Sequence, residues 1–177
     1  MALQSKEIDG TTSKPNLWDF KLYCTEDSIN EDSVTSSLTV EPRIYRATGT
    51  NASWIGSADI SCTISVTGCD DQTLSGNYTK NPINPGDYMS LGSKTFTVPH
   101  NDDGAKTIAI YASFTNDVSP PDGSASGEMT LTTIEVGTIR IAVNGEYKRG
   151  TPYVGVNGQW KKAKAYIGVS GQWKKGK

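Results

Sequence analysis

The sequence predicts an all-β protein: an immunoglobulin-like antiparallel β-sandwich followed by a C-terminal meander of short β-hairpin repeats. Apolar and polar residues alternate over short segments, polar turn residues separate those segments, and a phrase of about 13 residues repeats towards the C-terminus. We expect an N-terminal arm at 1–15, a β-sandwich domain at 16–136 and a β-hairpin repeat module of three units at 137–177.

The strands expected in the sandwich follow from alternation with a period of two residues. They are 16–24, 33–40, 58–66, 73–78, 93–98, 106–115 and 127–134. The rows expected to face the core are Trp18, Phe20, Leu22 and Cys24; Val34, Ser36, Leu38 and Val40; Ala58, Ile60, Cys62, Ile64 and Val66; Phe96 and Val98; Ile108, Ile110, Ala112 and Phe114; and Met129 and Leu131. Pro42 has no N–H to donate, so we expect the second strand to end, or to reach a sheet edge, at that residue.

Composition favours a soluble globular protein, because the 177 residues are 35% hydrophobic and 20% charged, with a mean hydropathy of −0.46. No apolar run approaches the roughly 18 residues of a membrane span, and the N-terminus lacks the apolar stretch of a secretory signal. We therefore expect synthesis in a cytoplasm and no membrane partner.

Charge is divided unevenly along the chain. Residues 1–138 hold 8 Lys and Arg against 18 Asp and Glu, a net charge of −10, whereas residues 139–177 hold 9 against 1, a net charge of +8. A basic end on an acidic body favours a negatively charged partner. The alternative is a role in solubility together with attraction to the acidic body of a neighbouring copy.

The repeated phrase predicts hairpins with two-residue turns. Asn157-Gly158 is the typical sequence of a type I′ turn, in which both central residues need a positive φ. With that turn, Val156 opposes Gln159, Gly155 opposes Trp160 and Tyr153 opposes Lys162, so the indole covers a strand glycine. The third unit repeats this arrangement with Gly168 and Trp173, and the first unit has Ala142 and Tyr147 in the same places.

Hairpins of this size bury too little to be stable alone, so the sandwich, a sister chain or a ligand should cover them. The residues expected to bind a partner or a glycan are Tyr147, Tyr153, Trp160, Lys161, Lys162, Tyr166, Trp173, Lys174 and Lys175. A small sheet that covers itself is the alternative. Helices in place of these hairpins, or hairpins whose indoles stay uncovered, would count against a role in assembly.

No cluster of residues predicts catalysis, so we expect no enzyme, no catalytic residue, no cofactor and no metal site. His100 lies beside Asp102 and Asp103, but a turn between two strands explains this stretch better than an acid–base pair. Calcium at this loop stays a minor alternative, because the distant glutamate of an EF-hand loop is missing. Three cysteines are expected as reduced thiols, with a Cys62–Cys69 disulfide as the alternative. Lysines and aromatic rings in the hairpin phrase suit sugars or teichoic acid better than nucleic acid, which we do not expect as a partner.

Two stretches carry a family resemblance. GSKTFTVPHNDDGAKTIAIYASFTND at 92–117, followed by GSASGEMTLTTI at 123–134, is similar to a β-sandwich domain of minor tail and baseplate-associated proteins from siphophages and prophages of Gram-positive bacteria. The terminal YVGVNGQWKKAKAYIGVSGQWKK at 153–175 is similar to hairpin repeats at the ends of such phage structural proteins.

This resemblance implies a bacteriophage virion structural protein, a component of the tail, baseplate or fibre that helps attach to the host surface. Its implied partners are other virion proteins, sister copies and cell-wall polysaccharide, and its implied location is the virion. The family's members are often longer, so a separate receptor-binding head is not expected in this chain. The alternative function is a carbohydrate-binding module that recognises Gram-positive cell-wall glycans.

Overall fold

The computed structural model describes residues 2–31, 33–49, 58–78, 84–116, 122–135, 139–143, 146–150, 152–163 and 165–175. Within these ranges the secondary structure consists of strands β1 to β15 and contains no helix. It follows that the described part of the chain has no helix able to cross a membrane. The all-β, sandwich-like fold predicted from the sequence is confirmed.

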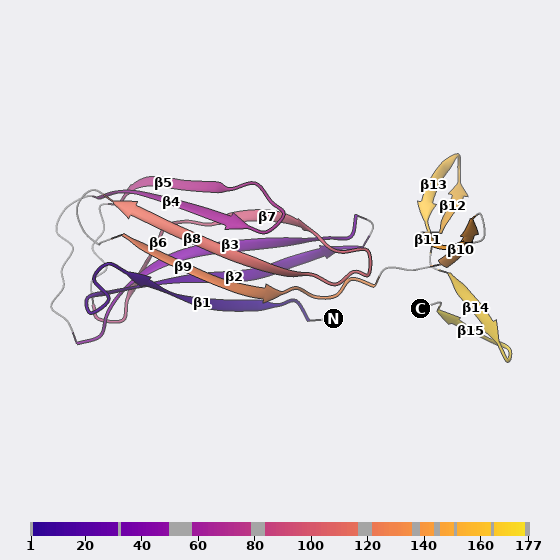
Figure 1. Cartoon of the computed structure of the whole chain (residues 1–177), viewed down its shortest axis with the longest axis horizontal. Coiled ribbons are helices and arrows are strands. Elements are labelled where there is room, and N and C mark those ends of the chain that lie inside the picture. The colour runs from indigo at the N-terminus through magenta and orange to yellow at the C-terminus, as the bar shows by residue number, and fades with distance from the viewer. Residues whose placement is uncertain are drawn as a thin grey trace.

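The first nine strands form the sandwich (Figure 1). They are β1 (Ser5–Thr12), β2 (Trp18–Asn30), β3 (Thr35–Arg46), β4 (Ala58–Val66), β5 (Gln72–Tyr78), β6 (Tyr88–Ser90), β7 (Lys94–Pro99), β8 (Thr107–Asn116) and β9 (Gly123–Thr130). Their order is β5-β4-β8-β9-β1-β2-β3-β6, with β7 also paired to β3, and every pairing is antiparallel. One layer thus contains β2, β3, β6 and β7, the other contains β4, β5, β8 and β9, and β1 joins them.

The strand β1 corrects the expectation of an N-terminal arm at 1–15. Its first part, Ser5–Asp9, pairs with β2, and its last part, Gly10–Thr12, pairs with β9. The crossing needs a glycine, because a Cβ on Gly10 would lie 2.4 Å from the Ser124 carbonyl oxygen. Sequence patterning misses this strand because Ile8 is the one large apolar residue among its inward-facing positions.

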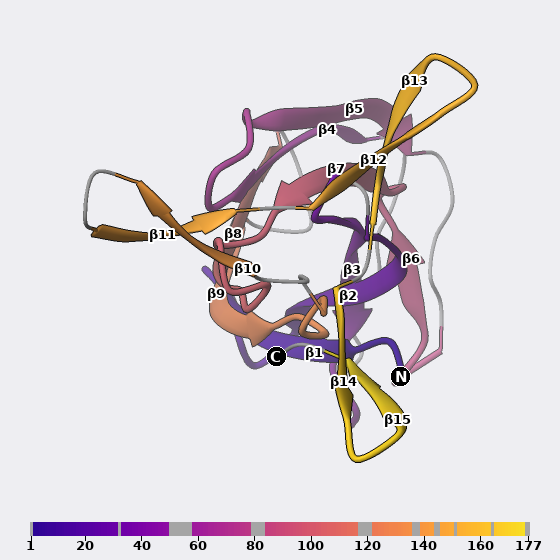
Figure 2. The same ribbon diagram turned by 90° about the vertical axis from the view of Figure 1, so that its right-hand side faces the viewer.

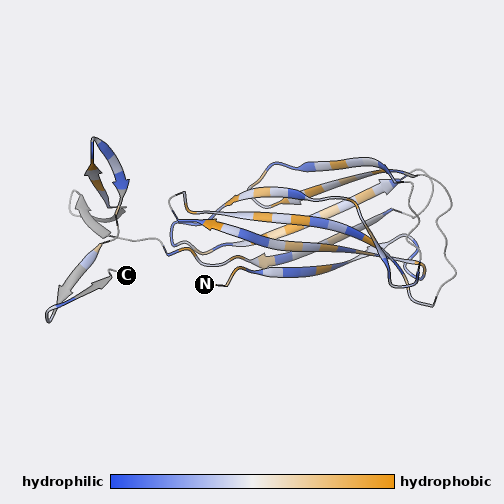
Figure 3. Cartoon of the chain, turned by 180° about the vertical axis from the view of Figure 1, so that it is seen from behind, coloured by the Kyte–Doolittle hydropathy of each residue, from blue (hydrophilic) through white to orange (hydrophobic). Residues whose placement is uncertain are grey.

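The core lies between the two layers, and most of it comes from the rows that alternation predicts. Val34 is an exception, because it is only half-buried and precedes β3 with a φ of 54°. Residues buried outside the predicted rows are Ile8, Ile44, Met89, Leu91 and Ile134. Colouring by hydropathy shows apolar and polar residues alternating along the strands (Figure 3). Phe20 and Phe114 meet across the core with ring centroids 4.8 Å apart. The fully buried large side chains are Trp18, Phe20, Phe96, Phe114, Leu22, Leu38, Ile44, Ile64, Ile108, Ile110 and Ile134.

All three cysteines are free thiols. Cys24 and Cys62 are part of the core, and burial raises the pKa of each thiol to about 12. Cys69 is half-buried and packs against the core, and its Sγ lies 3.5 Å from the Thr97 carbonyl oxygen. Buried thiols with a raised pKa are unreactive at neutral pH.

Of the two outcomes expected at Pro42, a strand end and a sheet edge, the strand end is wrong. β3 continues to Arg46, pairing with β7 as far as Val40 and with β6 from Arg43 onwards. Pro42 lies between these two pairings, so its missing N–H leaves no gap in either ladder. Its carbonyl oxygen still accepts a hydrogen bond of 3.0 Å from the Leu91 N–H.

On the side of the sandwich away from β1, between β5 and β7, side chains close the gap by donating hydrogen bonds to backbone carbonyl oxygens. The Tyr78 hydroxyl donates to the Leu91 carbonyl oxygen at 2.7 Å, and the Gln72 amide donates to the Thr95 carbonyl oxygen at 3.1 Å. These bonds engage carbonyl groups at a sheet edge that would otherwise be open to pairing with another chain.

The remaining strands form three hairpins. They are β10 (Ile139–Val143) with β11 (Glu146–Gly150), β12 (Tyr153–Val156) with β13 (Gln159–Lys162), and β14 (Tyr166–Val169) with β15 (Gln172–Lys175). Each pair is a separate two-stranded sheet, so the described strands do not join into the expected meander. Figure 2 shows the three hairpins pointing in different directions. Sequence predicts each turn, but no local signal specifies pairing between hairpins.

We expect Gly10→Ala to lower the free energy of unfolding by about 1–3 kcal/mol, because the added methyl group overpacks the crossing of β1. Gly76→Ala is the matched control, since a Cβ there meets the Tyr78 ring at an ordinary 3.4 Å. Chemical denaturation of both variants measures the difference. Equal stability of the two variants would show that the close approach at Gly10 is not a constraint.

Candidate functional site

The turns of the second and third hairpins have the predicted backbone. Asn157 and Gly158 have φ values of 52° and 76°, and Ser170 and Gly171 have values of 52° and 77°. Positive φ at both central residues is the mark of a type I′ turn, whose twist matches that of the flanking strands. Both turns are confirmed.

The register of each hairpin is also confirmed. In the second, Gly155 opposes Trp160, flanked by Val156 opposite Gln159 and by Tyr153 opposite Lys162. In the third, Gly168 opposes Trp173, and in the first, Ala142 opposes Tyr147. In the second and third hairpins a two-residue turn fixes these pairs, because it leaves the strands no freedom to slip.

The second hairpin and the start of the third present uncovered rings to solvent. Trp160 is 78% exposed, Tyr153 57% and Tyr166 52%. Lys161 follows Trp160 in the strand and is also exposed, but its pairing with Val154 places it on the other face of the hairpin. On the other face of the second hairpin, Val154 and Val156 are 49% and 38% exposed. Tyr147, Lys162, Trp173, Lys174 and Lys175 lie in paired strands, and their side chains fall outside the described part of the structure.

The exposure of Trp160 distinguishes between a second hairpin that covers itself and one that a partner must cover. Neither the sandwich nor the other described residues cover Trp160, so a sheet that covers itself does not account for it. Uncovered indoles were expected to count against an assembly role, and the Trp160 indole is uncovered in the single chain. An assembly role therefore requires that a second molecule covers this ring.

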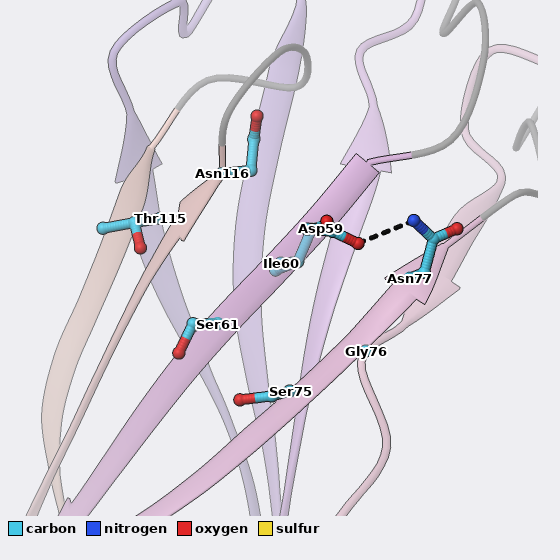
Figure 4. A pocket seen from close by; sticks show the side chains of 8 residues that line it. All are labelled: Asp59, Ile60, Ser61, Ser75, Gly76, Asn77, Thr115 and Asn116. Atoms are coloured by element: carbon cyan, nitrogen blue, oxygen red, sulfur yellow. Dashed lines mark hydrogen bonds between the residues drawn. The ribbon is translucent and has the colours of Figure 1, made fainter.

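A second candidate site lies on the outer face of the sandwich and was not expected from the sequence. A hollow of about 580 Å³ is lined by Asp59, Ile60, Ser61, Ser75, Gly76, Asn77, Thr115 and Asn116. Figure 4 shows Asp59 and Asn77 facing each other across β4 and β5, where the Asn77 Nδ2 donates to Asp59 Oδ1 at 2.6 Å. Cross-strand register brings them together, and Ser61 faces Ser75 in the same way. The hollow offers hydrogen-bonding groups, but its lining lacks the paired nucleophile and base of a hydrolytic site.

The outer face of the other layer carries a cluster of rings and charges. The Arg43 guanidinium lies 3.8 Å from the centroid of the Tyr23 ring and 4.3 Å from that of Tyr88, and it donates to Glu41 at 2.7 Å. The hydrogen bond from Arg43 holds the pKa of the Glu41 carboxyl below its ordinary value. Because Arg43 binds Glu41 and stacks on two rings, we interpret the cluster as support for the sheet, although the buried Arg43 Nε has no hydrogen-bond partner among the described residues.

A metal site finds no support in the described ranges, because they contain no group of three His, Cys, Asp or Glu side chains placed to hold an ion. The expected turn after β7 is confirmed, since the Gly104 N–H donates to the Asn101 carbonyl oxygen at 2.8 Å. In that turn the Asp103 carboxylate accepts a hydrogen bond from the Ala105 N–H at 3.0 Å. Asp103 therefore has a structural role in the loop.

Comparison with known proteins assigns no family. No protein-family model matches the chain, and no curated protein matches it. Among solved structures, the chain is similar to a crystal structure from Bordetella pertussis described provisionally as an ApaA protein, at 13% identity and a TM-score of 0.37. The match covers 67% of this chain and 96% of that one. A TM-score of this size bears on neither fold nor function.

We expect Gly158→Ala to unfold the second hairpin while the sandwich stays folded, because an L-residue at a φ of 76° costs about 1–2 kcal/mol. Gly155→Ala is the matched control in the same hairpin, since the nearest atom to its Cβ is Trp160 Cζ3 at 3.9 Å. Nuclear Overhauser effects between the Val156 and Gln159 amide protons report the pairing. Their survival in Gly158→Ala would contradict the turn assignment.

Proposed function

We propose that this chain is a bacteriophage virion structural protein, a tail, baseplate or fibre component that assembles through its hairpin module. The observation that carries this proposal is the small size of the second hairpin, a separate two-stranded sheet that buries too little to be stable alone. The exposed Trp160 counts against assembly unless a second molecule covers it. The sequence resemblance of 92–134 and 153–175 to phage tail proteins supports the virion as the place of assembly. The same resemblance motivates a role in attachment to the host surface.

Physical chemistry favours a protein partner that covers the hairpins. Exposed rings and aliphatic side chains contribute roughly 25 cal/mol for each Å² removed from water, and a neighbouring subunit can cover both faces of a hairpin at once. The hairpin region carries 9 Lys and Arg against 1 acid, whereas the sandwich region is acidic, so sister copies attract one another through these regions. Such attraction weakens as salt screens it.

Deleting 139–177 is expected to abolish self-association while leaving the sandwich folded. Light scattering measures the mass of the full chain and of the truncated chain, and near-ultraviolet circular dichroism reports the packing of core aromatics such as Trp18. An unchanged assembly state after the deletion would remove the proposal.

Single substitutions refine this test. Trp160→Ala should weaken self-association, whereas Tyr111→Ala should not, because Tyr111 is a 45% exposed ring on the sandwich and outside the hairpins. Equal weakening by both variants would point to general surface hydrophobicity and away from the hairpin module.

The second candidate function is a carbohydrate-binding module for Gram-positive cell-wall glycans. Tyr153, Trp160 and Tyr166 favour it, because exposed rings stack on the flat faces of sugars. The exposed Lys161 suits a phosphate-bearing polymer, although it lies on the other face of the hairpin, opposite Val154 in the pairing. A cell-wall pull-down or a glycan array tests it with Trp160→Ala and Trp173→Ala. Loss of binding in both variants, with Tyr111→Ala unchanged, is the expected result. Absent binding, or binding indifferent to these changes, eliminates this function.

A further inference from the structure

Tyrosine and arginine gather on the outer face of the layer that contains β2 and β3. We call Tyr23, Tyr45, Tyr88 and Arg43 the ring cluster, since strand pairing brings these side chains together. Tyr45 on β3 pairs directly with Tyr88 on β6, and its hydroxyl donates to the Tyr23 hydroxyl on β2 at 3.0 Å. On the outer face of the other layer, the described residues present one exposed ring, Tyr111. The two outer faces therefore differ in aromatic content.

Contacts within the ring cluster hold its side chains in place. The Arg43 guanidinium lies 3.8 Å from the centroid of the Tyr23 ring and 4.3 Å from that of Tyr88. The rings of Tyr45 and Tyr88 lie 5.3 Å apart between centroids. Side chains that are already ordered lose little entropy when a partner binds them. Tyrosine and arginine are also among the residue types that contribute most binding energy at protein interfaces. The ring cluster thus has the composition and the order of a protein-binding surface.

The ring cluster is open to a partner at the edge of its sheet. Tyr88 is 47% exposed, and it lies on β6, the last strand in the pairing order of this layer. Tyr23 and Tyr45 are half-buried by their neighbours. An incoming ring can therefore pack against Tyr88 without displacing any part of the described sandwich.

Carboxylates outnumber cations around the rings. Three rows of cross-strand pairs contain the ring cluster, and their four carboxylates and two cations give a net charge of −2. The charged residues of these rows are Glu7, Asp9, Asp19 and Glu41 against Lys21 and Arg43. Lys21 binds Asp9 at 3.0 Å, yet the Asp9 side chain remains 79% exposed, and Asp19 is exposed as well. A cation from another molecule can reach both of these carboxylates.

Charge identifies the occupant of this surface as a hairpin. Residues 139–177 carry 9 Lys and Arg against 1 acid, so two hairpin modules repel each other and an acidic surface attracts either of them. The second hairpin has Trp160, which is 78% exposed, followed by two lysines in the β13 sequence QWKK. One strand thus brings both a ring for Tyr88 and positive charge for the carboxylates beside it.

The position of the ring cluster favours a hairpin from a second copy over one from the same chain. Tyr45 and Tyr88 lie in the row of Asp19, near the start of β2. Residues 131–135 leave the sandwich near the other end of β2, where the Thr132 N–H donates to the Glu26 carboxylate at 3.0 Å. Figure 1 shows β6 towards the opposite end of the sandwich from that exit. The ring cluster therefore faces away from the start of its own hairpin module.

We propose that the ring cluster is the docking surface for the second hairpin of a second copy of this chain, with Trp160 packed against Tyr88. This inference rests on the proposed function, assembly through the hairpin module, and adds the place where the hairpin binds. The contact joins two different surfaces, and each copy has one of each. Copies therefore associate head to tail, and the contact repeats from copy to copy until a ring closes or a chain extends.

Self-association of the full chain, measured by light scattering over a range of concentrations, tests the docking surface. Tyr88→Ala is expected to weaken self-association at least about tenfold, because it removes the exposed ring of the surface. Tyr111→Ala is the matched control, since it removes a ring of similar exposure, 45%, from the other outer face. The control should associate as the wild type does.

Mixing two deficient variants tests the head-to-tail arrangement. Trp160→Ala keeps the docking surface and loses the docking ring, whereas Tyr88→Ala loses the surface and keeps the ring. Each variant alone should show the same weakened association. An equal mixture should form pairs with the wild-type affinity and grow no further, because one intact contact remains between two chains. A mixture that associates no better than its components would overturn the proposal.

Charge reversal gives a second measurement, which decides if Tyr88→Ala fails to fold. Asp19→Lys and Glu128→Lys make the same change at exposed positions on opposite outer faces. Only Asp19→Lys should weaken self-association, and the difference should shrink as salt rises. Equal effects of the two reversals would contradict docking at the ring cluster.

The outcomes separate this inference from the proposed function. If Tyr88→Ala and Asp19→Lys associate as the wild type does while Trp160→Ala does not, the ring cluster is not the docking surface, and assembly through the hairpins stands. If deleting 139–177 leaves self-association unchanged, the proposed function fails together with this inference. A wild-type chain that stays monomeric at every concentration also overturns docking between copies.

Discussion

The sandwich depends on one strand that belongs to both of its layers. β1 pairs with β2 over its first half and with β9 over its second, and the change of partner occurs at Gly10, where no side chain would fit. Without this crossing the two layers would be joined by core packing and by the side-chain bonds at the far edge. The constraint therefore acts through backbone geometry, and it lies in the part of the chain where hydropathy is least informative.

Much of the fold was predictable because the buried face of a strand shows in the sequence as apolar residues at every second position. The rows of β2, β4 and β8 alternate cleanly, and all of their predicted core residues with described side chains are buried. The hairpins were predictable to the level of individual pairs, since a two-residue turn fixes the register without any help from tertiary contacts. β1 was not, because Gly10 and Thr12 occupy inward positions without marking them as apolar.

The candidate sites show the same division between local and non-local information. Exposed rings on the second hairpin follow from local spacing, so Tyr153 and Trp160 were foreseeable. The ring cluster was not, because Tyr45 meets Tyr23 across 22 residues of chain and Tyr88 joins them from a separate strand. Its one sequence signal is that Tyr23 and Tyr45 lie at outward positions of alternating strands. The hollow at Asp59 and Asn77 likewise arises from strand pairing, which a single sequence does not reveal.

The independence of the three hairpins has a consequence for how the chain can vary. Each of these two-stranded sheets is paired within itself, so a unit can be added or removed without disturbing the register of the next. If each unit makes one weak contact, the strength of attachment grows with the number of units through effective concentration. The number of hairpin units would then set the avidity of the molecule, while the sandwich that carries them stays unchanged.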